Sequence, residues 1–276
     1  MIQTLRVAAA SSLLLITSNA LAAPVTDFFT LRGTTATTLS GTGNTDDPVM
    51  GTATETADGA RLIGYFAPQT LTNVGDSITL TYDVSFTVGT IVSSSDNWRY
   101  ALYDPQTASQ ETTNSNLNVN GTANTEPFRG YWYGVDTNAG ATGAQGTIRE
   151  RSGTVANVDP FANATADQVG SPTGLVTLAS GQTYTGTMTL TLSNINEITL
   201  SGMFSGNGGS NTFSFVDTSP ATTTYSVVGF LNGGGINADQ VTFNNVDVTF
   251  TPIPEPAALG LAGIAAWGLA RRRRRA

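Results

Sequence analysis

The chain offers carboxylates, hydroxyls and arginines for chemistry, because it contains no Cys, His or Lys. Without His there is no Ser-His-Asp triad and no ordinary zinc site, and without Lys no Schiff base can form. Glycoside hydrolysis would need two carboxylates about 5–9.5 Å apart across the sugar. Glu150 is flanked by two arginines and is expected to form surface ion pairs, Glu197 stands alone, and Asp46 and Asp47 are adjacent. We therefore expect no catalytic residues.

Calcium is the cofactor that oxygen ligands alone could hold. The candidate ligands lie in loops, and none follows the spacing of a calcium-binding loop. They are Asn44 with Asp46, Asp96 with Asn97, Asp104, and Asp136 with Asn138. Loop Asp and Asn residues also form turns without any metal. Calcium binding stays an alternative to which no ligands are assigned, and no other cofactor is expected.

Aromatic residues are the remaining candidate site, because sugars stack on exposed rings that have polar neighbours. Trp98, Tyr103 and Trp132 are the candidate carbohydrate contacts. Strand alternation places Trp132 on the face opposite Tyr131 and Tyr133. One of these faces is core, and the other is either a binding platform or ordinary core as well.

Strands must position these residues. Residues 77–88 alternate perfectly between apolar and polar side chains, residues 184–192 repeat the pattern, and 241–250 form the last strand with a bulge at Asn244-Asn245. About ten to twelve such strands predict an all-β fold, a two-sheet antiparallel sandwich. Phrases such as GDSITLTYDVSF, NWRYALYD and RGYWYG, over about 61–250, resemble concanavalin A-like jelly-roll domains. That fold hosts both lectins and glycoside hydrolases.

The N-terminus has the pattern of a secretory signal peptide. One Arg precedes an apolar stretch, and Ala20-Leu21-Ala22 provides a cleavage site that predicts a cut between Ala22 and Ala23. Between the two ends, about 23–251, six arginines face 19 acidic residues, which gives a net charge of −13. Such a surface repels nucleic acid, so nucleic-acid binding is excluded.

The C-terminus combines three elements in a fixed order: Pro254-Glu255-Pro256, an apolar stretch at 257–270, and five arginines. The prolines stop a helix from continuing backwards. Fourteen residues span about 21 Å as a helix, short of a hydrocarbon core of about 30 Å. The basic stop on the cytoplasmic side consists of Arg271, Arg272, Arg273, Arg274 and Arg275.

This order resembles the PEP-CTERM sorting signal of Gram-negative bacteria. The resemblance implies processing by an exosortase, transient tethering in the inner membrane, and delivery to the cell surface or extracellular matrix, with polysaccharide as a partner. The alternative for the tail is a plain anchor. The expected domains are a signal peptide (1–22), a Thr/Gly-rich segment (23–60), the sandwich (61–251) and the sorting signal (252–275). We expect a non-enzymatic protein; the alternative is a secreted carbohydrate-active enzyme.

Overall fold

The fold was obtained as a computed structural model. It describes residues 20–31, 39–40, 48–51, 59–88, 98–110, 125, 127–135, 137, 146–153, 159–162, 166–233, 236 and 238–253. Within these ranges the chain forms strands and turns and no helix. The described residues therefore include no helix that is long and apolar enough to cross a membrane. The expected signal peptide before residue 20, the motif Pro254-Glu255-Pro256, the tail helix and the Arg run lie outside the described residues.

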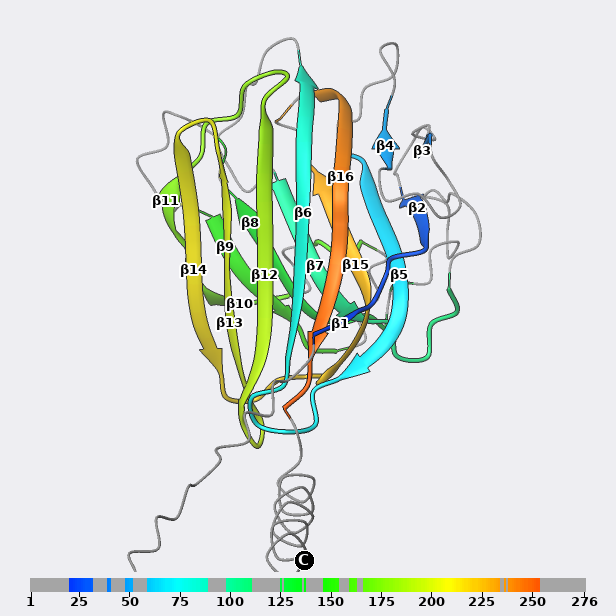
Figure 1. Cartoon of the computed structure of the whole chain (residues 1–276), viewed down its shortest axis with the longest axis vertical. Coiled ribbons are helices and arrows are strands. Elements are labelled where there is room, and N and C mark those ends of the chain that lie inside the picture. The colour runs from blue at the N-terminus through cyan, green and yellow to red at the C-terminus, as the bar shows by residue number, and fades with distance from the viewer. Residues whose placement is uncertain are drawn as a thin grey trace, which may run out of the picture.

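Two antiparallel sheets pack face to face (Figure 1). In the nine-stranded sheet the order is β11-β14-β13-β12-β6-β16-β4-β3, and β1 also pairs with β16. Its strands are β1 (Leu21–Ala22), β3 (Leu39–Ser40), β4 (Val49–Met50), β6 (Ser77–Val88), β11 (Thr173–Leu175), β12 (Thr183–Asn194), β13 (Glu197–Gly206), β14 (Gly209–Asp217) and β16 (Ala238–Thr251).

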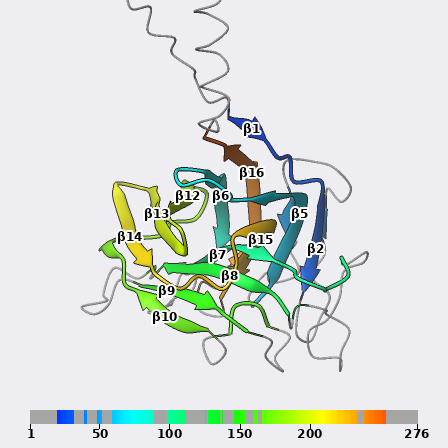
Figure 2. The same ribbon diagram turned by 90° about the horizontal axis from the view of Figure 1, so that it is seen from below.

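The seven-stranded sheet has the order β10-β9-β8-β7-β15-β5-β2. Its strands are β2 (Asp27–Leu31), β5 (Arg61–Thr70), β7 (Trp98–Asp104), β8 (Arg129–Val135), β9 (Gly146–Arg151), β10 (Asp167–Gly170) and β15 (Thr224–Asn232). Figure 2 shows the two layers from below, with β7, β8 and β9 across from β12, β13 and β14. The expected all-β jelly-roll sandwich is confirmed. Strands β2, β3 and β4 of the Thr/Gly-rich segment also pair into the two sheets.

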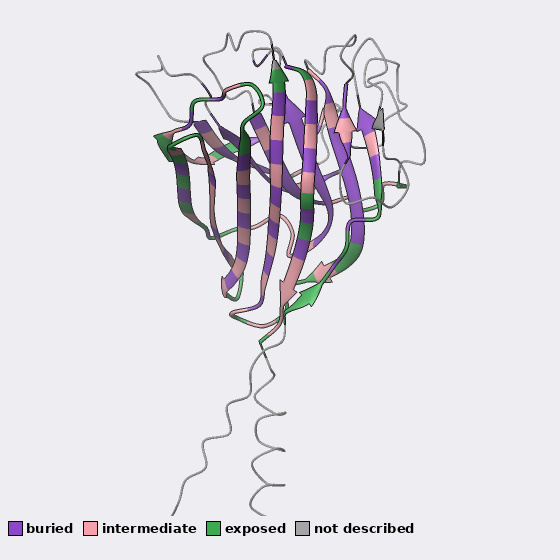
Figure 3. Cartoon of the chain, turned by 45° about the horizontal axis from the view of Figure 1, so that its top comes forward, coloured by how far each residue is buried: buried purple, intermediate pink, exposed green. Residues whose placement is uncertain are grey.

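Alternation along β6 explains how the nine-stranded sheet packs. The side chains at 78, 80, 82, 84 and 86 are fully buried, and Thr79, Thr81 and Ser85 on the opposite face are partly exposed. The same banding runs along β12 and β16 (Figure 3). The predicted bulge is also present, because the register of β16 shifts between Asn244 and Asp247, and Asn245 adopts a φ of 53°. This left-handed conformation is one that Asn tolerates better than most residues.

The side chains between and outside the two sheets form two hydrophobic clusters. The larger one fills the space between the sheets, where Tyr82, Trp98, Phe230 and Phe243 pack as an aromatic group. A second, smaller cluster lies on the outer face of the seven-stranded sheet. It consists of Leu31, Ile63, Tyr65, Ala101, Tyr103, Phe128, Trp132, Phe161, Ala166, Val227 and Leu231. The seven-stranded sheet is therefore apolar on both faces.

Candidate functional site

The aromatic candidates divide between these two clusters. Trp98 lies between the sheets, and its indole Nε1 donates a hydrogen bond of 2.8 Å to the Tyr82 hydroxyl. Trp132 lies on the outer face, opposite Tyr131 and Tyr133, as the alternation predicted, and Tyr103 lies on the same outer face. All three candidates are fully buried. None of them is presented to a ligand in this structure, and the interpretation as core accounts for their burial.

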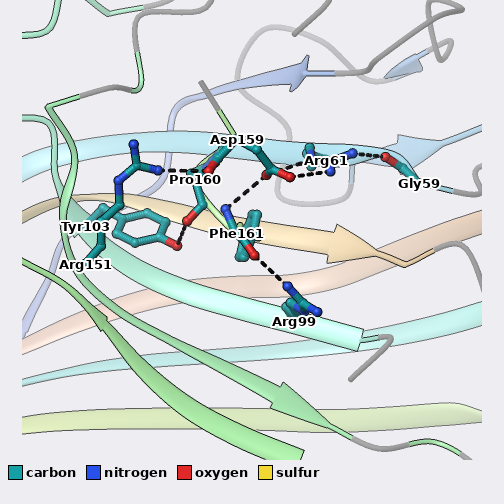
Figure 4. Close-up of polar contacts among 8 residues, drawn as sticks. All are labelled: Gly59, Arg61, Arg99, Tyr103, Arg151, Asp159, Pro160 and Phe161. Carbon is teal, nitrogen blue, oxygen red and sulfur yellow. Dashed lines mark hydrogen bonds and ion pairs between the residues drawn. The ribbon is translucent and has the colours of Figure 1, made fainter. Parts of the chain in front are cut away.

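A short segment of the chain itself covers the outer face. Residues 159–161 cross over the seven-stranded sheet, and the Tyr103 hydroxyl donates to the Pro160 carbonyl at 2.8 Å (Figure 4). Phe161 packs edge-on against Trp132, with ring centroids 6.5 Å apart. Arg99 places its guanidinium 4.5 Å from the centre of the Trp132 ring. Side chains of the protein itself thus occupy the space beside the Trp132 ring where a sugar would stack.

Arginines fasten the covering segment to the sheet. Arg61 donates to both carboxylate oxygens of Asp159, at 2.9 and 2.5 Å, and forms the one ion pair found among the described residues. Arg99 donates to the Phe161 carbonyl at 2.5 Å and Arg151 to the Asp159 carbonyl at 2.9 Å (Figure 4). Burial alone would raise the pKa of Asp159, but the hydrogen bond and charge of Arg61 outweigh it and lower the pKa below its ordinary value.

Glu150 corrects one sequence expectation. It does not form surface ion pairs, because β9 turns its neighbouring arginines to the outer face and Glu150 to the inner one, where it is only 7% exposed. Its carboxylate accepts a hydrogen bond of 2.7 Å from the Ala221 amide. Asp217, 8% exposed, is its hydrogen-bonded neighbour and accepts at 2.5 Å from the Tyr131 hydroxyl. Sequence alone could not bring residues 150 and 217 together.

The electrostatics of this acid pair follow from its burial. Desolvation, opposed by the Ala221 amide and reinforced by the neighbouring Asp217, raises the pKa of Glu150 to about 7. Burial and the same acids also raise the pKa values of Tyr131 and Tyr225. A carboxyl with a raised pKa can act as a general acid only where substrate reaches it. This pair is enclosed, and it lies beside Tyr131 and Tyr225 rather than beside either candidate tryptophan.

The described residues include one of the candidate calcium ligands, Asp104. No group of three or more acidic side chains among them could hold a metal ion. Asp104 is the described member of the candidate loops, and its carboxylate accepts hydrogen bonds from Thr222 and Gln106. Asn44, Asp46, Asp96, Asn97, Asp136 and Asn138 lie outside the described residues. Calcium therefore stays an untested alternative, with no ligands assigned.

The junction between β16 and the tail is a second place where specific side-chain contacts fix the chain. Asp76, which is almost fully buried in the turn before β6, accepts hydrogen bonds from the amides of Thr72 and Asn73 at 2.9 and 2.7 Å. Its other oxygen accepts from the Ile253 amide at 2.7 Å. Gly75 lies under Ile253, where a Cβ would come within 2.8 Å of the isoleucine side chain. The chain is thus held to the sandwich up to Ile253.

Comparison with protein families identifies the segment beyond this junction, since the PEP-CTERM protein-sorting motif matches residues 252–275. The chain carries a sorting signal. The match begins at Pro252, one residue after β16 ends at Thr251. The PEP-CTERM motif indicates export and membrane-anchored sorting to the cell surface, with an exosortase as the processing enzyme. It covers the tail and does not describe the sandwich.

The sandwich resembles lectins in overall fold. The winged bean acidic lectin complexed with methyl-alpha-D-galactose aligns at 12% identity and a TM-score of 0.46, covering 85% of this chain and 98% of the lectin. The VIP36 exoplasmic/lumenal domain in its Ca²⁺/mannose-bound form aligns at 11% identity and a TM-score of 0.46, covering 84% and 85% of the two chains. The search of curated proteins found no match.

Proposed function

We propose that this protein is an exported, non-enzymatic component of the extracellular polysaccharide matrix, delivered to the cell surface and released when an exosortase processes its tail. The sorting motif at 252–275 carries the proposal. The signal-peptide pattern at the other end of the chain supports it, because both membrane-directed segments flank one acidic sandwich. The mature body begins near Ala23 and ends near the Pro-Glu-Pro.

The burial of the candidate reactive groups supports the non-enzymatic assignment. The two carboxyl residues Glu150 and Asp217 are only 7% and 8% exposed, and residues 159–161 cover the outer aromatic face. One described surface hollow, of about 190 Å³, lies at the β12–β13 turn and is lined by Asn194, Ile195, Asn196, Glu197 and Thr218. It contains a single carboxylate, which already accepts from the Ser193 hydroxyl.

Hydroxyls on the outer face of the nine-stranded sheet support polysaccharide as the partner. Thr79 and Thr189 sit side by side on β6 and β12, with their Oγ1 atoms 2.9 Å apart. Thr249 pairs with Thr79 on one side, and Ser201 pairs with Thr189 on the other, so a row of hydroxyls crosses four strands. The strand spacing places neighbouring members of this row about 4.8 Å apart across the sheet. A polymer of neutral sugars presents hydroxyls at comparable intervals.

Binding can be tested with a matched pair of variants. The body should co-sediment with extracellular polysaccharide isolated from the host, and Thr79→Val with Thr189→Val should weaken this binding. The control is Thr70→Val with Thr224→Val, which removes a hydroxyl pair of the same 2.9 Å geometry from the other sheet. Equal binding by both double variants would show that the hydroxyl row is not the contact.

A secreted carbohydrate-active enzyme is the second candidate, and the Glu150–Asp217 pair is the observation that favours it. A carboxyl with a pKa near 7 has the protonation state that a general acid needs. Release of reducing sugar from that polysaccharide, abolished by Glu150→Gln, would replace the matrix proposal with the enzyme. No release by the native body, assayed between pH 5 and 8, is the result we expect.

A further inference from the structure

Exposed apolar side chains gather at one end of the sandwich. The large hydrophobic residues exposed in the described part of the chain are Leu21, Val74, Ile195, Val216 and Ile253. Val74, Ile195 and Ile253 are 55%, 78% and 39% exposed. They lie in the turn before β6, in the β12–β13 turn, and directly after β16. We call these three residues the apolar pole.

The sheet register brings these three positions together. Ser77, the first residue of β6, pairs with Thr191 near the end of β12 and with Thr251 at the end of β16. The turns are also joined directly, since the Gly75 amide donates to the Leu192 carbonyl at 2.7 Å. All three strand ends therefore meet at the lower end of the sandwich in Figure 1.

The tail leaves from the same end. Asp76 holds Ile253 through the hydrogen bond of 2.7 Å. Three residues, 254–256, separate this fixed point from the apolar stretch at 257–270. From Ile253 to Ala257 the chain makes four steps, which reach at most about 14 Å when extended. When the apolar stretch is in lipid, Ile253 is consequently held within about 14 Å of it, and the rest of the apolar pole lies at the same end of the sandwich.

We propose that the apolar pole rests on the membrane interface while the tail is inserted, and that Asp76 sets this orientation. The occupant of the pole is the lipid surface itself, since apolar side chains on a membrane-facing surface enter the headgroup boundary by about 5–10 Å. The sandwich then stands on its end, with its strands rising away from the bilayer. Its hydroxyl face and its acidic surface remain in the aqueous space. This inference rests on the proposed tethering by the tail.

The natural absence of Cys allows a direct test. Ile195→Cys and Val74→Cys, labelled with the fluorophore NBD, would be placed in the chain from residue 23 to 276 and reconstituted into phosphatidylethanolamine/phosphatidylglycerol vesicles. Gln182→Cys is the matched control, because it is an exposed turn residue at the other end of β12. We expect blue-shifted emission and quenching by brominated lipid at 195 and 74, and neither effect at 182.

A linker insertion tests the role of the junction. Ten Gly/Ser residues between Ile253 and Pro254 leave every described contact intact but release the fixed spacing, so quenching at 195 should fall to the level at 182. Asp76→Asn, checked for native circular dichroism, should reduce the quenching in the same direction. Quenching that survives the insertion unchanged would overturn the role given to the junction.

Vesicle flotation separates the two ways of failing. If the labelled chain floats with the vesicles but the probes at 195 and 182 behave alike, the apolar pole does not face lipid, and tethering still stands. If the chain does not float, the tether fails, and the orientation fails with it. A blue shift at 195 that needs no vesicles and grows with protein concentration would assign the pole to contact between copies, which also contradicts the proposal.

Discussion

Replacing Glu150 by Gln should stabilise the body at alkaline pH. The carboxyl has an ordinary pKa of 4.5 and is raised to about 7 in the folded chain, chiefly by desolvation. A raised acid pKa means that the folded state favours the protonated form of Glu150. The contribution of this residue to stability is therefore fully present below pH 4.5 and is lost as the pH rises through 7. At about 1.4 kcal/mol for each factor of ten, the loss above pH 8 is roughly 3 kcal/mol.

Gln is neutral at every pH and can still accept from the Ala221 amide and donate to Asp217, which keeps the enclosed contacts. Urea unfolding of residues 23–253 from pH 4 to 9 would measure the effect. E150Q should match the native body at pH 4 and exceed it by about 3 kcal/mol at pH 8, or roughly 6–12 °C in Tm.

Asp247→Asn provides the charge-matched control, because it removes one carboxylate from an exposed position on β16. It should leave the loss of stability between pH 4.5 and 7 in place. The reasoning is refuted if E150Q and the native body keep the same stability difference at pH 4 and pH 8. That result would mean that water or a cation reaches the pair and keeps Glu150 ionised at little cost.

Three further predictions concern the cover, the core and the N-terminus. Asp159→Asn should cost about 1–3 kcal/mol at neutral pH, because it breaks the bidentate pair with Arg61. Tryptophan emission should shift to the red as water reaches Trp132. Since the pKa of Asp159 is lowered, this stability difference should begin to shrink below pH 3.8 and be lost as the pH falls through the lowered pKa. Gly186→Ala should cost about 1–3 kcal/mol, because a Cβ there would lie 2.2 Å from the Tyr82 ring, whereas Gly153→Ala, with nothing within 4 Å, should be nearly neutral in thermal melts. The exported chain should begin at Ala23, whose amide donates to the Val248 carbonyl, and N-terminal sequencing of surface protein would check this.

The architecture was predictable because period-2 alternation records which face of a strand is buried. Residues 77–88 show it without interruption, and the structure has a strand with those bounds. The bulge at Asn244-Asn245 was predictable from the switch in apolar parity. Both features are local, so neighbouring residues alone determine them.

The sites were less predictable, because they depend on contacts between distant residues. The face of Trp132 followed from alternation, but the cover over Trp132 comes from residue 161, in a segment with no strand pattern. The flanking arginines suggested an exposed Glu150, whereas the strand turns them to the opposite face. Nothing in the sequence around Asp76 indicates its hydrogen bond to the Ile253 amide, 177 positions away.

Mass spectrometry of the protein recovered from the cell surface and medium of the native host tests the central claim most directly. Sorting by the motif at 252–275 predicts molecules that lack the apolar stretch and the Arg run, with a new C-terminus near Pro254-Glu255-Pro256. Deleting the exosortase, or replacing Glu255, should leave the intact tail in the membrane fraction. Abundant surface molecules that still end in the Arg run, unchanged by either perturbation, would show that the segment is only an anchor.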